Sequence, residues 1–192
     1  MELIILPKDM SEELLNFDIS DITSEVWDEI LKELKDLNQD VEFKEVNLGR
    51  GADWVLILVV LSSIVSVISL GDKMEKGIDG WIKIGNRLKK LFEKSDRLYV
   101  DVEGAKILAI TNISEDRDIN SLVLVDSHTN SLTDFSLWFK DRKPENFISK
   151  PFNIYYFTFE VNFETVVTLA VKSNGEIVRL LDVDIEEVNN FF

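Results

Sequence analysis

The sequence predicts an α+β fold in which an antiparallel β-meander of about six or seven strands, mostly in the C-terminal half, packs against three main helices. Three observations predict it. Apolar residues recur at helical spacing before residue 97, they alternate with polar residues after residue 98, and turn-forming residues separate the alternating segments. A chain of 192 residues is long enough to bury a core as a single α+β domain, with a helix-rich half at 1–97 and a β-rich half at 98–192.

The first elements are a short strand and an amphipathic helix. Residues 3–6 are apolar and Pro7 follows them, which predicts a first strand. Apolar residues then recur at intervals of three and four over about 20–37, opposite an acidic face, which predicts a helix with Ser20 or Asp21 as its N-cap. Alternation around Phe43 predicts a short strand that ends before Gly49.

A run of apolar residues at 54–70 contains no charge and is interrupted only by serines. Its β-branched residues would suit two buried strands, but the central serines lack the glycine or asparagine that a tight hairpin favours. Asp53 can cap the start and Gly71 the end, so the run predicts a buried apolar helix over 54–70. Its length is at the short limit for crossing a bilayer, which favours a core helix over a membrane span.

A second amphipathic helix is expected directly after this run. Asp79 is its expected N-cap, and apolar residues from Ile78 to Phe92 mark one face. Gly85 lies on that face and would let the helix pack closely against the serine side of the preceding helix. Residues 52–94 are therefore expected to form a helical hairpin.

The C-terminal half predicts a meander. Glu103-Gly104 is expected to be a tight turn between strands, and Asn174-Gly175 is the strongest hairpin signal in the chain. The polar residues from Asp126 to Thr129 predict a turn after a third strand. The strands of this half are expected at 98–102, 105–113, 122–125, 132–139, 154–161, 165–172 and 176–183.

Charge and composition narrow the possible partners. With 21 basic and 36 acidic residues the net charge is −15, which disfavours nucleic acid and anionic membranes and favours a basic protein. Residues 72–97 are the exception, with 8 basic and 5 acidic side chains. The chain has no cysteine, so disulfides and thiolate metal sites are excluded. The N-terminus lacks the features of a signal peptide, so a cytoplasmic location is expected.

Few residues suggest chemistry. His128 near a carboxylate and a hydroxyl could serve acid–base catalysis, and Asp101 and Glu103, two apart on an expected strand, could share a metal. A polar turn and a solvated strand face explain the same residues without any activity. No catalytic residue, metal ligand or cofactor is therefore expected. An enzyme with an unrecognised carboxylate-based site stays open as an alternative.

The expected function is that of a non-enzymatic acidic protein-binding module, such as an immunity, antitoxin-like or inhibitory protein of bacterial conflict. Its expected binding face is the acidic side of the helix over 20–37, where negative charge could steer a basic partner. The residues expected to contact that partner are Asp21, Glu25, Asp28, Glu29 and Glu33.

The alternative is a membrane-associated protein that uses the hairpin over 52–94. Aromatic residues of this segment would lie at the interface and basic residues would face lipid phosphates. The residues expected to do so are Trp54, Trp81, Lys83, Arg87 and Lys90. The sequence does not specify an oligomeric state.

Overall fold

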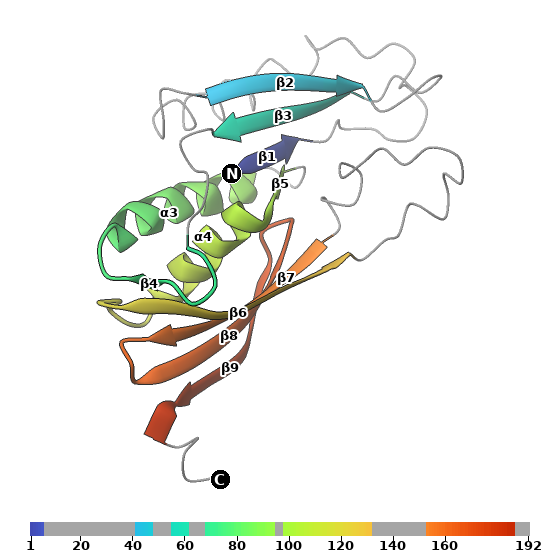
Figure 1. Cartoon of the computed structure of the whole chain (residues 1–192). Helices are drawn as coiled ribbons and strands as arrows, with labels where there is room; N and C mark the ends of the chain where they lie inside the picture. The colour runs from blue at the N-terminus through green and yellow to red at the C-terminus, as the bar shows by residue number, and fades with distance from the viewer. Residues whose placement is uncertain (6–40, 48–54, 62–67, 95–97, 132–152, 187–192) are drawn as a thin grey trace.

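The computed structural model describes residues 1–5, 41–47, 55–61, 68–94, 98–131 and 153–186. Within these ranges the chain forms two antiparallel sheets and two helices, which confirms the α+β class (Figure 1). The helix expected over 20–37 and the strand expected over 132–139 lie outside the described residues. The single-domain organisation stays a prediction.

The first sheet has four strands in the order β2-β3-β1-β5. The expected strands near the N-terminus and around Phe43 are confirmed as β1 and β2, and both pair with β3. Strand β5 pairs with the other side of β1. The bounds are Glu2–Ile5 for β1, Val41–Asn47 for β2, Val55–Leu61 for β3 and Leu98–Val100 for β5.

The helix predicted over 54–70 is wrong, because Val55–Leu61 form strand β3. This strand lies between β2 and β1 and pairs with both. A short continuous run rich in valine and isoleucine is compatible with a strand as well as with a helix, and its β-branched residues favour the strand. Residues 68–70, at the other end of the apolar run, are not helical either. The helical hairpin expected over 52–94 therefore does not form.

The second sheet has five strands in the order β4-β6-β7-β8-β9. Strands β7, β8 and β9 form the last part of the expected meander, within one residue of the predicted bounds. The first strand expected in that meander, β5, belongs to the other sheet instead. The Asn174-Gly175 turn is confirmed, with Gly175 at a φ of 87°. The bounds are Lys73–Met74 for β4, Leu122–Ser131 for β6, Asn153–Val161 for β7, Thr165–Lys172 for β8 and Ile177–Asp184 for β9.

The two helices are α3 (Ile78–Lys94) and α4 (Val102–Ile113); α4 packs against one face of the second sheet, and α3 packs against α4 (Figure 1). Helix α4 lies between α3 and strands β7 and β8, so it is surrounded by protein. The strand predicted over 105–113 is wrong, because this segment is helical and nearly all of its residues are buried. Its buried residues are Gly104, Ala105, Lys106, Ile107, Leu108, Ala109, Ile110, Thr111 and Ile113.

Asp101 is the N-cap of helix α4 and also accepts a hydrogen bond from the backbone of strand β1. Its Oδ1 accepts a hydrogen bond of 2.9 Å from Gly104 N, and its Oδ2 accepts one of 2.8 Å from Glu2 N. The predicted turn at Glu103-Gly104 is therefore wrong, since both residues belong to the first helical turn. Asp101 and Glu103 do not form a carboxylate pair on a strand, because Glu103 binds Lys106 Nζ at 2.8 Å.

Gly85 of α3 makes the close contact that its position on the apolar face predicts, but with a different helix. The contact residue is Thr111 of α4, whose Oγ1 would overlap any Cβ added at position 85. The Thr111 hydroxyl is buried and donates a 2.8 Å hydrogen bond to Ile107 O. The two helices therefore approach each other more closely than a side chain at position 85 would allow.

The two sheets meet at the end of β5. Val100 N donates a 2.8 Å hydrogen bond to Ser173 O, next to the turn between β8 and β9. The Tyr155 hydroxyl of β7 donates to Val100 O at 3.3 Å. Burial raises the pKa of Tyr155 to about 12, so this hydroxyl remains a donor over the whole neutral range.

Arg179 of β9 fastens the last strand to the C-terminal end of α4. Its guanidinium donates to Asn112 O at 2.7 Å and to Asn112 Oδ1 at 2.9 Å, and it pairs with Asp116 at 2.5 Å. The carbonyl of Asn112 lies in the last helical turn, where carbonyls lack partners within the helix. The hydrogen bond from Arg179 also holds the pKa of Asp116 below its ordinary value of 3.8.

Arg179→Met is expected to lower the free energy of unfolding at pH 7 by up to about 1 kcal/mol, because water reaches and screens this partly exposed pair. A lowered carboxylate pKa stabilises the fold above the unfolded value of 3.8, and the effect is lost as the pH falls through the folded pKa. The difference between the two proteins should therefore narrow below about pH 4. An NMR titration should show the pKa of Asp116 rising in Arg179→Met and unchanged in Lys172→Met. An unaltered Asp116 titration in Arg179→Met would contradict the assignment.

Candidate binding surface

The second sheet has one face that no described helix or strand packs against, and we call it the outer face. Along β7 and β8 every second side chain is buried against α4, including Phe157, Phe159 and Leu169. The intervening side chains point the other way. Strand register extends this face to β6 and β9. Its residues are Val123, Val125, Asp126, His128, Asn130, Ile154, Tyr156, Thr158, Glu160, Val166, Thr168, Ala170, Lys172, Val178, Leu180, Leu181 and Val183.

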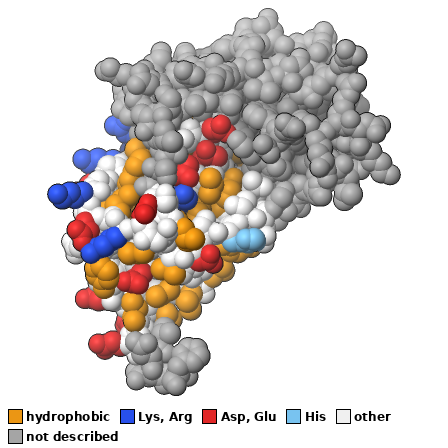
Figure 2. All heavy atoms as spheres, viewed as in Figure 1, with side chains coloured by type: hydrophobic (Ala, Val, Ile, Leu, Met, Phe, Trp, Pro, Cys, Tyr) orange, Lys and Arg blue, Asp and Glu red, His pale blue; other side chains and the backbone are white. Residues whose placement is uncertain are grey.

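Apolar side chains dominate the outer face. Val125 is 49% exposed, and on β9 the exposed fractions are 45% for Val178, 55% for Leu180 and 44% for Leu181. Figure 2 shows hydrophobic side chains spread over the described part of the sheet, up to the single pale blue histidine. Contiguous exposed apolar surface on a folded protein usually marks an interaction site. The outer face is therefore the leading candidate for binding.

The charges of the outer face that lack an ion-pair partner among the described residues are acidic. Asp126 lies opposite Thr158, and Glu160 lies opposite Val123. Neither carboxylate makes an ion pair with any described cation. Lys172 of β8 also lies on this face, opposite Ile154, and is paired with Glu176 at 2.6 Å. A partner that covers this face would therefore contact apolar side chains and two carboxylates that have no ion-pair partner among the described residues.

His128 lies on strand β6, so the turn predicted over 126–129 is wrong. Its Nε2 lies 2.8 Å from Asn130 Oδ1, and its ring centre lies 6.3 Å from that of Tyr156. Asp126 Oδ1 accepts a hydrogen bond from Ser127 N instead of contacting the imidazole. These neighbours do not assemble a nucleophile and its base, which require direct hydrogen bonding.

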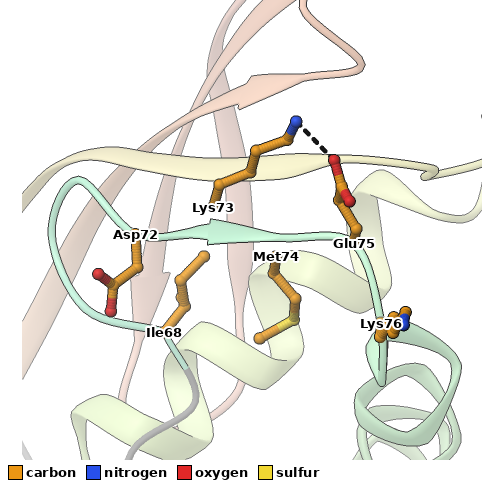
Figure 3. A pocket seen from close by; sticks show the side chains of 6 residues that line it. All are labelled: Ile68, Asp72, Lys73, Met74, Glu75 and Lys76. Carbon is orange, nitrogen blue, oxygen red and sulfur yellow. Dashed lines mark ion pairs between the residues drawn. The ribbon is translucent and has the colours of Figure 1, made fainter.

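A shallow pocket of about 530 Å³ lies beside β4 (Figure 3). Lys73 and Glu75 point away from Asp72 and pair with each other at 2.5 Å. Ile68, on the lining, accepts a 3.0 Å hydrogen bond from the buried Lys106 through its carbonyl. Small-molecule sites hold polar groups that converge on the ligand, and this pocket does not. Among the described residues, no group of three His, Asp or Glu side chains could hold a metal ion.

The described residues proposed for membrane contact do not form one exposed surface. Lys83 and Lys90 are exposed on α3, Arg87 is half-buried, and Trp81 packs against the core. The apolar face of α3 is buried, including Leu88 and Leu91, so it is not available to lipid. Within the described ranges, no helix is both long and apolar enough to cross a membrane. Trp54 lies outside the described residues.

The acidic face expected to bind a partner also lies outside the described residues, with all five of its members, Asp21, Glu25, Asp28, Glu29 and Glu33. It stays a prediction. The sequence did contain a signal for the outer face that was missed. In β8, Val166 and Ala170 are apolar although their neighbours Val167 and Leu169 already fill the core side. A comparison with known proteins adds no precedent for either surface, because no family model, no curated protein and no solved structure matches this chain.

Proposed function

We propose that this protein is a non-enzymatic binding module whose outer face docks a basic protein. The supporting observation is the exposed apolar group on β9, formed by Val178, Leu180 and Leu181, on the same face as the unpaired carboxylates of Asp126 and Glu160. Interfaces between proteins commonly combine an apolar centre with polar groups around it. The net charge of −15 would also steer a cationic partner toward the chain and repel acidic competitors.

Such a partner would carry a basic surface, like that of a protein that acts on nucleic acid. Covering that surface would block its contacts with phosphate. Immunity and antitoxin-like proteins of bacterial conflict are inhibitors of this kind, and we propose the same class for this chain. The acidic helix face around Asp21 and Glu25 is a second proposed contact within the same function.

Reversal of the two outer-face charges tests the proposal. The double variant Asp126→Lys, Glu160→Lys should bind the basic protein isolated with the wild-type chain from its native host at least about tenfold more weakly by calorimetry. Its affinity should also depend less on salt.

A matched control reverses Asp72 and Glu93, two exposed acids on the β4 and α3 side of the molecule, and changes the net charge by the same amount. This control variant should bind the basic protein with wild-type affinity. Equal losses in both double variants would mean that net charge alone drives binding. Unchanged affinity in Asp126→Lys, Glu160→Lys would exclude the outer face as the site.

A further inference from the structure

Strand β9 forms an edge of the second sheet. It pairs with β8 on one side and with no described strand on the other. On the side that no described strand occupies, alternate residues of this 8-residue strand direct their backbone donors and acceptors outward. An edge of this length is suited to pairing with another strand, which would extend the sheet.

A β-bulge at Leu180 changes the order in which side chains alternate along β9. The pairing with β8 steps from Thr168↔Leu181 to Leu169↔Arg179, so Leu180 is an extra residue. Leu181 lies opposite Thr168 of the outer face, and Leu180 follows Arg179, which lies opposite the buried Leu169. Alternation therefore places both leucine side chains on the outer face. Arg179 lies opposite the buried Leu169 and therefore points to the inner side of the sheet.

Asp182 lies opposite the buried Val167 and points inward as well. From Val178 to Val183 the side chains therefore follow the order outer, inner, outer, outer, inner, outer. This order is symmetric about the Leu180–Leu181 bond. Residues that face each other in an antiparallel pair lie on the same face of the sheet. Two copies of a regular strand cannot pair about a two-fold axis that lies between adjacent residues, because adjacent residues point to opposite faces of the sheet. The bulge makes such an axis possible, because the adjacent residues Leu180 and Leu181 point to the same face.

The chemistry of the strand has the same symmetry. About this axis Val178 would face Val183 of a second copy, and Leu180 would face Leu181 of that copy. Arg179 would face Asp182 of the second copy, and the two-fold axis would repeat this pair of opposite charges. Arg179 already donates all of its N–H groups within its own chain, so this match acts through charge rather than through new hydrogen bonds.

We propose that β9 is a homodimer interface, in which two copies pair antiparallel about the Leu180–Leu181 bond and join their second sheets into one continuous sheet. Bulges and inward-pointing charges on an edge strand normally hinder pairing with other chains. On β9 the same features fit a second copy and reject strands that lack this symmetry. The dimer would also place two outer faces side by side.

Disulfide trapping tests the register directly, because the chain has no cysteine of its own. In the full-length variant Val178→Cys, Val183→Cys, each new cysteine would face its counterpart in the second copy. Within one strand the two positions are roughly 16 Å apart, too far for a disulfide. Mild oxidation should therefore convert most of the protein from 22.1 kDa to a covalent dimer on non-reducing electrophoresis.

The single variants Val178→Cys and Val183→Cys are the controls. In the proposed register, position 178 of one chain faces position 183 of the other, so the cysteine of a single variant does not face the same cysteine in the second copy. Each single variant should therefore give several-fold less dimer than the double variant. Equal cross-linking in single and double variants would overturn the register. An absence of cross-linked dimer in the double variant would overturn the interface.

Sedimentation equilibrium provides an independent measurement. The wild-type chain should associate to twice its monomer mass, and Leu180→Lys should weaken this association at least about tenfold. Val125→Lys is the matched control, because Val125 lies at a bulge of β6 and is about as exposed as Leu180. This variant should associate like the wild type. A wild-type chain that stays monomeric at all concentrations would overturn the dimer. It would leave the proposed binding of a basic protein intact, since that test relies on Asp126 and Glu160.

Discussion

Gly85→Ala is expected to lower the free energy of unfolding by about 1–3 kcal/mol, the range for overpacking of a tight core contact. A Cβ at position 85 would overlap the Thr111 hydroxyl and lie 3.1 Å from Ile107 O. Thr111 cannot move aside without cost, because it is fully buried and hydrogen-bonded to the same carbonyl. Urea denaturation followed by circular dichroism measures the effect.

Gly80→Ala is the matched control in the same helix. A Cβ at position 80 would have no atom within 4 Å. The substitution should therefore raise the free energy of unfolding by up to about 1 kcal/mol, since alanine favours the helix and restricts the unfolded chain. Opposite signs for the two substitutions would identify the α3–α4 contact as the cause. A stabilising effect at both positions would mean that the helices can separate cheaply at Gly85.

The C-terminal meander could be predicted from the sequence because two independent signals agree there. Strand β7 alternates regularly between buried and half-buried residues, which a period of two predicts. The Asn174-Gly175 pair then fixes the turn between β8 and β9, because Gly175 adopts a positive φ that glycine tolerates. Helix α3 was predictable for a similar reason, since only one of its faces is apolar.

Two segments could not be assigned because their nearly continuous apolar sequences carry no periodic signal. Strand β3 is uniformly apolar, and so is most of α4, although one is extended and the other helical. The length of the run at 54–70 favours a helix, but residues 55–61 form a strand because they pair with β1 on one side and with β2 on the other. For α4 the missed signals were Asp101 as an N-cap and the contact of Glu103 with Lys106 three residues later.

The candidate binding surface was harder to predict than the fold. Alternation in β7 and β8 separates two faces, but it does not state which face α4 will cover. The bulge at Leu180 depends on pairing with β8 and has no signature in the sequence of β9 alone. The apolar outer face and the symmetric edge strand therefore become visible only when the strands are paired.

Asp101→Ala is expected to lower the free energy of unfolding by about 2 kcal/mol. The substitution removes the N-cap of α4, which is worth roughly 0.5–2 kcal/mol. It also leaves Glu2 N without its 2.8 Å acceptor, so the contact between β1 and the start of α4 is weakened. Asp79→Ala, at an exposed acid in the first turn of α3, should cost less than about 0.5 kcal/mol.

The pH dependence of this loss follows from the environment of Asp101. Burial raises its pKa above the ordinary value of 3.8, against the opposing effect of the hydrogen bond from Gly104 N. A carboxyl whose folded pKa is raised stabilises the fold most below the unfolded value, and this contribution is lost as the pH rises through the folded pKa. The destabilisation by Asp101→Ala should therefore grow as the pH falls from 7 toward 3.8, which denaturation series at several pH values can measure. A loss that shrinks on acidification would mean instead that the hydrogen bonds from Gly104 and Glu2 outweigh burial, so that Asp101 stabilises the fold most when ionised.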